Sequence, residues 1–329
     1  MISMKKQKYA AFVVPTGIGA SIGGFAGDAS CYARELASDI PLIVNPNVVN
    51  AACFSGISSN MLYTEGWTIS QFFKGNLSLI PSKNNKVGVI FDRSISQKIL
   101  NIHINTINAV KTVYGVDVVG YEVCDESSGV EFFMTENNIS SGALKNEKTL
   151  LAAAKKLIAR GAQTIAVVCH FDEPPEDDYS QGNSPDIVGG VEAIISHYLT
   201  RELMVPVVHA PAFEVIDMTG EIVDPRAAAE YITPTFLPCI LLGLQNAPLI
   251  KPKLDEKYVT VNDIAALVMP SNALGASIVF DAIGRKIPVF AVEENKSVLN
   301  VDSYALGLDD DIIKLSKYSD VYANLEKVL

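Results

Sequence analysis

The stretch EKTLLAAAKKLIARGAQTIAVVC, residues 147–169, places a helical pattern directly before a strand pattern, and this unit decides the fold. Its first part carries apolar residues at helical spacing on one face, namely Leu150, Leu151, Ala154, Leu157 and Ile158. Gly161 follows where a C-terminal cap is expected, and the apolar run 164–169 comes directly after it. The stretch therefore predicts an α-helix that leads into a buried β-strand.

The same helix-to-strand unit occurs twice more. Residues 96–114 end at Gly115 and precede the run 116–123, and residues 190–203 precede the run 205–209. Apolar runs rich in Val and Ile, without polar alternation, stand at 9–14, 41–45, 87–91, 116–123, 164–169, 205–209, 264–269 and 287–292. Such runs are typical of strands covered on both faces. The order of elements predicts an α/β fold of Rossmann-like type, with mostly parallel sheets flanked by helices.

The sequence leaves two domain organisations open. The chain forms either a single compact α/β unit over residues 1–329 or two similar lobes with a cleft between them and a boundary near 170–190. The longest segment without periodicity, HFDEPPEDDYSQGNSPD at residues 170–186, lies at that place. Its acidic residues lack the spacing of a calcium loop, so a solvated lid is favoured over a cation site.

Composition excludes several classes of protein. A formal net charge of −11 without basic clusters argues against a nucleic-acid partner. No apolar run is long enough for a membrane helix, and no signal peptide is recognisable, so a cytoplasmic protein is expected. Five scattered cysteines indicate neither a disulfide framework nor a metal site. A homo-oligomer is expected only from its general frequency among soluble proteins.

A glycine-rich loop follows the first predicted strand. The stretch FVVPTGIGASIGGFAGDAS, residues 12–30, contains five glycines and resembles a dinucleotide fingerprint, with one extra residue in the spacing. That fingerprint also requires an acidic residue at the end of the next strand, about 20 residues further on. The next strand ends in Asn45 and Asn47 instead. An NAD(P)-dependent oxidoreductase therefore stays open only as an alternative.

The loop has a counterpart late in the chain. VVPTGIGASI, residues 13–22, is echoed by VMPSNALGASI, residues 268–278. In each we expect a strand, a proline, a small-residue loop and then Gly-Ala-Ser opening a helix, where backbone N–H groups and a hydroxyl can bind an anion. The alternative is that Ser21 and Ser277 only cap their helices.

Ligands of open α/β sheets bind beyond the carboxyl ends of the strands, so the residues there are the candidates for function. Cys169 and His170 form a reactive-looking pair, although adjacent strand residues point to opposite faces. Glu293 and Glu294 follow the last apolar run and offer acid–base chemistry or a site for a cationic group. These four residues are the catalytic candidates.

The ligand-binding candidates lie in the two glycine-rich loops or follow other predicted strands. They are Thr16, Gly17, Gly19, Ser21, Gly23, Asp28, Asn45, Asn47, Asn50, His209, Ser271, Asn272, Gly275 and Ser277. Asparagine side chains can bind a carboxylate or amide, and asparagines beside prolines also form ordinary turns. His103 and His197 lie within helical patterns and are expected to be structural.

Several motifs together resemble a known family. PTGIGASIGGFAGDA, NPNVVNAA, GVEAIISHYLTRE, HAPAF, TFLPCILLGLQNAP and AVEEN are similar to domain of unknown function family 3326, over essentially the whole chain. This resemblance implies no activity.

A second resemblance concerns architecture. The units KVGVIFD, GVDVVGYEV, LLAAAKKLIARGAQTIAVVC and VEAIISHYLTRELMVPVV resemble the aspartate/glutamate/hydantoin racemase superfamily, which implies two cysteines on opposite sides of a substrate carbon. Cys169 matches one position, but His170-Phe171 follows it instead of the superfamily's Asn-Thr or Thr-His. Cys53 and Cys124 are the candidates for the other position.

Three functions remain from the sequence. The first is an enzyme, of isomerase or lyase type, that acts on a small anionic metabolite in a cleft at the strand ends. The second is a non-catalytic protein that binds a metabolite or nucleotide. The third is the NAD(P)-dependent oxidoreductase. No cofactor is assigned.

Overall fold

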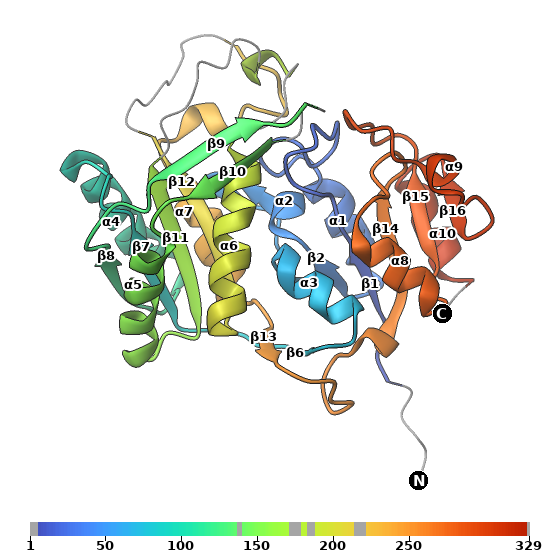
Figure 1. The fold of residues 1–329 in the computed structure, drawn as a ribbon, viewed down its shortest axis with the longest axis horizontal. Coiled ribbons are helices and arrows are strands. Elements are labelled where there is room, and N and C mark those ends of the chain that lie inside the picture. Colours follow the sequence, from blue (N-terminus) through green and yellow to red (C-terminus); the bar gives the residue numbers. More distant parts are fainter. Residues whose placement is uncertain (1–5, 137–139, 171–178, 183–187, 214–221, 328–329) are drawn as a thin grey trace.

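The computed structural model describes residues 6–136, 140–170, 179–182, 188–213 and 222–327. Two parallel sheets stand beside each other (Figure 1). The first sheet has six strands in the order β5-β2-β1-β14-β15-β16. Its strands are β1 (Tyr9–Phe12), β2 (Leu42–Val44), β5 (Met61–Tyr63), β14 (Ile264–Pro270), β15 (Val289–Val292) and β16 (Ile312–Leu315).

The second sheet has four parallel strands in the order β8-β7-β11-β12. They are β7 (Val87–Phe91), β8 (Val118–Val123), β11 (Thr164–His170) and β12 (Val207–Ala212). Each of the apolar runs expected to be a strand overlaps one of the strands of these two sheets. The predicted α/β class with parallel sheets flanked by helices is therefore confirmed.

The first sheet reverses its strand order between β1 and β14. The chain goes from β1 to β2 on one side of the sheet. It goes from β14 to β15 on the other side. This is the order of a doubly wound nucleotide-binding sheet, in which a crevice opens beyond the carboxyl ends of the two strands at the reversal. Both loops that the sequence singles out begin there.

Helices cover both faces of each sheet (Figure 1). On the first sheet, α1 (Ser30–Leu36) and α10 (Ser319–Leu325) pack on one face, and α3 (Gly66–Phe73) and α8 (Ser277–Gly284) on the other. On the second sheet, α4 (Gln97–Tyr114) and α7 (Leu237–Gln245) oppose α5 (Glu147–Ala159) and α6 (Gly189–Leu203).

The smaller elements complete the described chain. They are α2 (Pro46–Val49), α9 (Ser303–Leu306), the strand pairs β3 (Asn50–Ala51) with β4 (Phe54–Ser55), β6 (Ser78–Ile80) with β13 (Leu249–Lys251) and β9 (Val130–Met134) with β10 (Ser140–Leu144), and 3-10 turns at Tyr179–Gln181, Glu230–Ile232 and Val261–Asp263.

Helix ends follow the sequence signals. The hydroxyl of Ser96 accepts a hydrogen bond from the N–H of Ile99 at the start of α4. Gly115 ends that helix with φ of +70°, and Gly161 stands two residues after α5 with φ of +99°. Such angles strain residues that have a Cβ, so glycine is the favoured residue at both turns.

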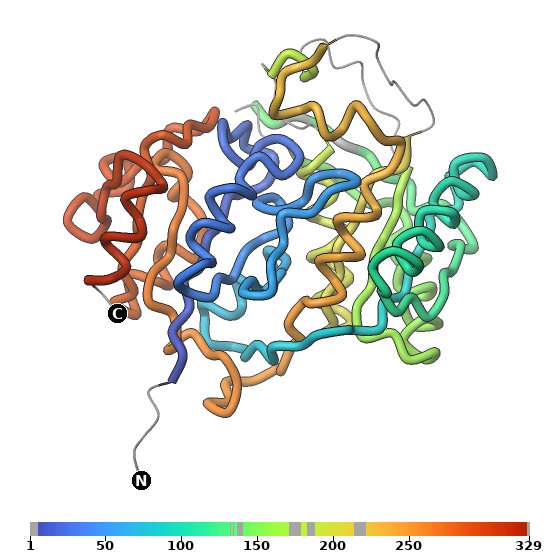
Figure 2. The backbone as a smooth tube through the Cα atoms, turned by 180° about the vertical axis from the view of Figure 1, so that it is seen from behind, coloured from blue at the N-terminus to red at the C-terminus, as the bar shows by residue number. Residues whose placement is uncertain are grey.

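Two strands link the sheets. The chain passes toward the second sheet through β6 and returns through β13, and these strands pair antiparallel beneath both sheets (Figure 2). One apolar cluster contains core residues of both sheets, including Phe12 of β1 and Phe91 of β7. The pairing and the shared core hold the two sheets in one arrangement.

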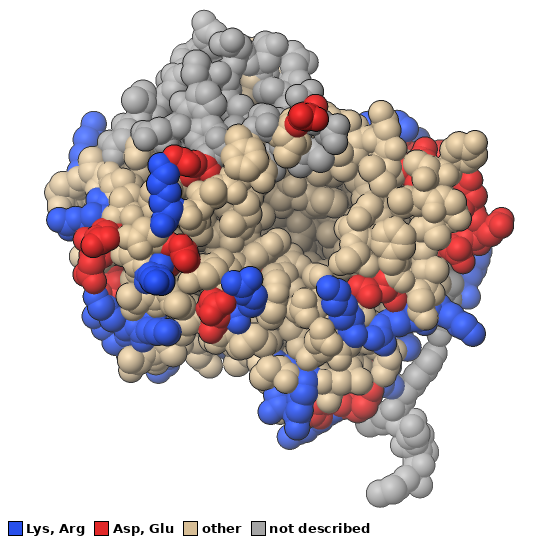
Figure 3. Space-filling view, in the orientation of Figure 1, with Lys and Arg blue, Asp and Glu red and all other residues tan. Residues whose placement is uncertain are grey.

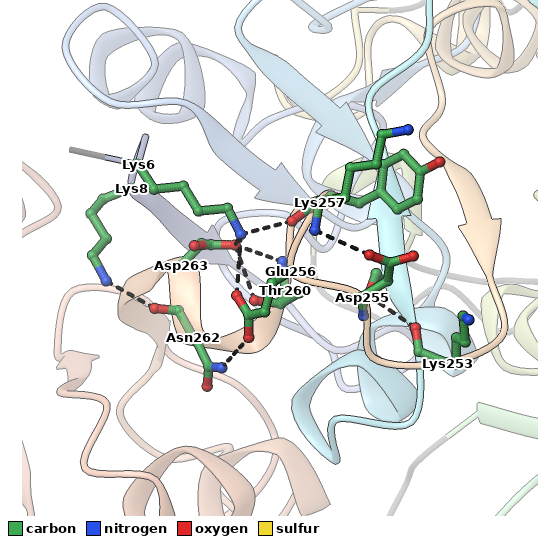
Figure 4. A network of polar contacts seen from close by, with 11 residues as sticks. Lys6, Lys8, Lys253, Asp255, Glu256, Lys257, Thr260, Asn262 and Asp263 are labelled. Atoms are coloured by element: carbon green, nitrogen blue, oxygen red, sulfur yellow. Dashed lines mark hydrogen bonds and ion pairs between the residues drawn. The ribbon is translucent and has the colours of Figure 1, made fainter. Parts of the chain in front are cut away.

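A polar network fastens the start of β1 beside β14 (Figure 4). The Lys6 ammonium lies 2.7 Å from the Asp263 carboxylate and donates to the carbonyl of Tyr258. Asp263 accepts from the backbone and hydroxyl of Thr260 in a capping box. Lys8 donates to the carbonyl of Asn262. This network and the parallel pairing of β1 with β14 together hold the start of β1 beside β14.

Most of residues 170–190 lies outside the described residues, so the acidic lid expected at 170–186 and the open boundary near 170–190 receive no structural account. His170 ends β11, and Gly189 begins α6, which packs on the sheet that contains β11.

Asn45, which follows β2, offers a test of how the ends of β1 and β2 are held together. Its amide donates to the carbonyl of Val14 at 2.8 Å and accepts from the N–H of Val14 at 3.1 Å, and the bonds are buried. We expect Asn45→Ala to lower the free energy of unfolding by about 2 kcal/mol, because the buried N–H of Val14 loses its acceptor and the carbonyl of Val14 keeps only a longer bond, at 3.4 Å, from the Asn47 amide. Urea unfolding measures this.

The control is Asn76→Ala, since Asn76 is exposed and its amide bonds only Gln71. It should change stability by less than about 0.5 kcal/mol. Equal stability of the two variants would contradict the bridging role of Asn45.

Candidate functional site

A cavity of about 970 Å³ lies between the two sheets and is lined by residues of both. Figure 3 shows the face hollowed there. From the first sheet, Thr16 follows β1, Asn45 and Asn47 follow β2, and Ala276, Ser277 and Ile278 begin α8. From the second, α6, the end of β12 and residues 230–240 complete the wall. The size is that of a pocket for a small organic molecule.

The two glycine loops reach this cavity unequally. Thr16 of the first loop and Ser277 of the second both line it. Gly19 and Ser21 instead line a separate hollow of about 230 Å³, beside Arg226 and Lys296. Gly275 lies outside both pockets, where a Cβ on it would stand 3.1 Å from Val301. The first loop reaches the cavity through the residues next to β1 and through Gly24, Phe25 and Ala26, and the second loop reaches it at the start of α8.

One expectation about the first loop is wrong. Gly-Ala-Ser was expected to open a helix in both loops, but only Ser277 begins one, and α1 starts at Ser30, nine residues after Ser21. Gly17 and Gly19, which precede Ser21, have φ of +75° and +56°. The residues between Ser21 and Ser30 form consecutive turns, in which Gly23 and Gly27 have φ of +82° and +67°. A helix does not form there because a residue in the left-handed conformation interrupts α-helical hydrogen bonding.

Hydrogen bonds occupy other predicted side chains of the first loop. The Asp28 carboxylate accepts from the N–H of Gly23 at 2.7 Å, and burial raises the pKa of Asp28 to about 6. The Ser21 hydroxyl accepts from the N–H of Lys296 at 2.8 Å. Both side chains fix the shape of the loop.

The predicted amide groups are engaged by the protein itself. Both polar atoms of Asn45 bond Val14, and the Asn47 amide donates to the carbonyl of Gly23. Asn50 accepts from the hydroxyl of Tyr63 at 2.7 Å. All three residues line the cavity.

The predicted residues after β14 hold a loop in place. Asn272 donates to the carbonyls of Ser297 and Leu299 and accepts from the hydroxyl of Ser297. The N–H of Ser271 donates to the carbonyl of Val292. Neither residue lines the cavity.

The catalytic candidates from the sequence lie elsewhere. Cys169 is fully buried in the apolar cluster beneath α5 and α6, and burial raises its pKa well above the ordinary value of a thiol. The His170 ring contacts the carbonyl of Ala212. Glu293 is exposed, and the Glu294 carboxylate accepts from the N–H of Tyr318. None of the four lines the cavity.

The cysteines proposed to complement Cys169 do not line the cavity either. Cys124 is buried with its pKa raised to about 12, mainly by burial, and Cys53 is half-buried. Cys239 of α7 does line the cavity, but its thiol donates to the carbonyl of Phe236 and burial raises its pKa to about 12. At neutral pH these thiols carry their protons.

Four side chains that the sequence analysis did not select project into the cavity: Glu65 at the start of α3, and Glu192, Ser196 and His197 on α6. Glu192 and Ser196 stand one helical turn apart, so both lie on the same face of α6. This face adjoins the one that carries Val191, Ile195 and Leu199 into the core. Helical periodicity could have placed residues 192, 193, 196 and 197 on one face of the helix. It does not show whether that face borders a cavity or the solvent.

Glu65 is a buried carboxyl group at a helix start. It caps α3 by accepting from the N–H groups of Trp67 and Thr68, and its side chain is only 3% exposed. Burial raises the pKa of Glu65 from its ordinary 4.5 to about 7, against the opposing effect of these hydrogen bonds. Glu65 therefore keeps its proton to a higher pH than an ordinary glutamate does.

His197 is the neighbour of Glu65. Its Nε2 lies 3.7 Å from Oε2 of Glu65, and a Cβ on Gly66 would lie 2.6 Å from that nitrogen. Desolvation, with a smaller effect from His209, lowers the pKa of His197 to about 4. At neutral pH the ring is uncharged, so the contact is a carboxyl–imidazole pair and not a fixed ion pair.

His209 is the one predicted ligand-binding histidine that the structure brings to the cavity. Its Nδ1 lies 2.6 Å from the Ser196 hydroxyl, and its Nε2 lies 3.0 Å from a carboxylate oxygen of Glu192. His209 and Glu192 side chains are each 13% exposed. Ser196, His209 and Glu192 thus contact one another in series, with the histidine in the middle.

The charge of the described lining is one-sided. Glu65, Glu192 and Glu230 contribute carboxyl groups, and no Lys or Arg belongs to the described part of the wall. Besides α3, which Glu65 caps, the helices α2, α6 and α7 also start at residues of the wall, and so does α8. The backbone at the start of α8 supplies partial positive charge without a basic side chain.

The chain belongs to the DUF3326 family, described as a protein of unknown function, whose model matches residues 9–326. The family resemblance predicted from the motifs is confirmed. An uncharacterized lipoprotein of Synechococcus sp. is 34% identical over 303 residues, which cover 90% of this chain and 84% of that protein. No solved structure matches the chain significantly. The racemase resemblance stays a prediction.

Within the described ranges, no helix has the length and apolar character needed to cross a bilayer. Among the same residues, no three His, Cys, Asp or Glu side chains gather closely enough to hold a metal ion.

The raised pKa of Glu65 predicts a pH-dependent stability. Between about pH 5 and 8 the folded chain binds more protons at Glu65 than the unfolded chain, so the free energy of unfolding falls as the pH rises. Glu65→Gln keeps an acceptor for the cap but does not titrate. Relative to this variant, we expect the natural chain to lose about 2 kcal/mol between pH 5 and 8.

Urea unfolding of both chains at several pH values measures the difference, in which all other titrating groups cancel. Parallel curves for the two chains would show that Glu65 has an ordinary pKa.

Proposed function

We propose that this member of the DUF3326 family is an enzyme that binds a small, polar metabolite between its two sheets and acts on it by proton transfer. The observation that carries the proposal is the meeting of two carboxyl–histidine pairs on one cavity. Glu65 with His197 comes from the contact of α3 with α6, and Glu192 with His209 comes from α6 and β12.

The proton-carrying properties of Glu65 support this function. A general acid or base works best when its pKa lies near the working pH, and a pKa of about 7 meets that condition. Burial raises the pKa here, as in other carboxyl groups that act as acids at neutral pH. The uncharged His197 beside it can accept or return the proton.

The ligand is proposed to carry at most one negative group. The sequence predicts an anionic metabolite, and the start of α8 with Ser277 offers hydrogen-bond donors to a carboxylate. The described lining has no Lys or Arg and three carboxyl groups, which disfavours a multiply charged phosphate. A single carboxylate attached to a partly apolar body fits the wall better.

The isomerase- or lyase-type reaction remains part of the proposal, because both begin with proton removal by a group such as Glu65. The cytoplasmic location also remains a proposal, and the relative from Synechococcus is named a lipoprotein. A homo-oligomer and the absence of a nucleic-acid partner stay predictions from the sequence.

The alternatives find less support in the geometry. A dinucleotide fingerprint uses its glycine turn to open the helix that receives the pyrophosphate, whereas α1 begins only at Ser30. A purely binding protein would not need a carboxyl group that is costly to ionise in its wall.

Solvent deuterium exchange tests the proposal. We expect ¹H NMR of a defined panel of hydroxy, keto and amino acids in D₂O to show enzyme-dependent loss of the proton next to the carboxyl group in at least one compound. Glu65→Gln should slow this exchange by at least about 100-fold, the usual contribution of a general acid or base.

Glu293→Gln is the matched control, because Glu293 is an exposed carboxyl group away from the cavity. It should exchange at the rate of the natural chain. Exchange in no compound of the panel, or a greater loss in Glu293→Gln than in Glu65→Gln, would refute the assignment of catalysis to this cavity.

A further inference from the structure

Ser196 occupies an unusual position for a serine inside a helix. In α4, the hydroxyls of Thr106 and Thr112 donate to the carbonyls four residues earlier, at 2.9 and 2.8 Å, which is the common arrangement. The Ser196 hydroxyl instead contacts Nδ1 of His209 at 2.6 Å. The side chain is thus directed away from its own helix and toward a base.

The second nitrogen of His209 decides the direction of the hydrogen bonds. Nε2 lies 3.0 Å from an oxygen of Glu192, and a carboxylate can only accept. The ring proton therefore belongs on Nε2, which leaves Nδ1 with a lone pair that accepts the Ser196 proton. This is the arrangement of a nucleophile, a base and an orienting carboxylate, with the two ring nitrogens exchanged relative to the usual serine triad.

Both ring nitrogens of His209 are occupied, so the ring presents neither to a ligand. Ser196 lines the cavity. Of the three residues Ser196, His209 and Glu192, it is the one whose oxygen can form a new covalent bond. The other oxygen of Glu192, Oε1, is buried and has no hydrogen-bond partner within the described residues. A donor group on a bound molecule can satisfy it and hold that molecule beside Ser196.

We infer that Ser196 is a nucleophile activated by His209, with Glu192 as positioning residue, and that the cavity takes a carboxylic ester or thioester with no more than one negative charge. The inference rests on the proposed function, since it assigns chemistry to the same cavity. It adds a covalent step to the proton transfers proposed there.

The step balances with water as the only co-reactant. The Ser196 oxygen bonds the carbonyl carbon while its proton passes to Nδ1 of His209, and the bond to the alcohol or thiol breaks as that group takes the proton. Water then attacks the acyl group, gives its proton to Nδ1 and releases the acid, and the proton returns to Ser196. Glu192 stabilises the imidazolium ring formed in between.

A sulfonyl fluoride tests the nucleophile without knowledge of the substrate. Phenylmethanesulfonyl fluoride is incubated with the full chain, and tandem mass spectrometry locates the sulfonylated residue. We expect the adduct on Ser196, formed as the S–F bond breaks and HF is released. His209→Gln should slow its formation by about 1,000-fold, because the base is lost.

Glu192→Gln separates positioning from a merely structural role. We expect labelling at least about 10-fold slower, and we expect the midpoint of its pH profile to move to lower pH because the carboxylate no longer stabilises the imidazolium. Ser38→Ala, an exposed serine outside the cavity, should label like the natural chain. The melting temperature of each variant reports its folding.

Absence of an adduct on Ser196 in the natural chain, or equal labelling rates in the natural chain and His209→Gln, overturns the inference. If deuterium exchange still depends on Glu65 in that case, the proposed function survives and only the nucleophile is refuted. If neither is observed, both fall.

Discussion

The parallel pairing of β1 with β14 is the contact on which the arrangement of the site depends. Because the strand order of the first sheet reverses between them, the segments that follow the two strands diverge and leave a crevice at their carboxyl ends. Lys6 with Asp263 fastens one end of this pair, and Asn45 bridges to β1 at the other. The crevice becomes a cavity because the second sheet closes it from the far side.

Helix α6 has two functions because its two faces differ. Val191, Ile195 and Leu199 pack on the second sheet, while Glu192 and Ser196 lie on the face directed to the cavity. The same helix also contacts α3, which brings His197 to Glu65. A single helix therefore carries groups of both carboxyl–histidine pairs, and the burial that this packing causes raises the pKa of Glu65.

The fold was largely predictable from sequence, and the site was not. Strands such as 87–91 and 164–169 are buried on both faces, so their composition alone identifies them. Glu65, Glu192 and Ser196 are polar residues at helix positions, where the pattern is the same for a solvent-facing side and a cavity-facing side. The adjacent Cys169 and His170 resemble a reactive pair, but in the structure the cysteine is sealed in the core and the histidine contacts Ala212.

Crystallographic screening with small carboxylate, amide and ester fragments tests most directly whether the space between the two sheets is the functional site. We expect fragments to gather in the cavity, with polar atoms within hydrogen-bond distance of Glu65, Glu192, Ser196 or the start of α8. Fragments that bind instead at the hollow beside Gly19 and Ser21, or near Glu293, with only water between the sheets, would contradict this expectation.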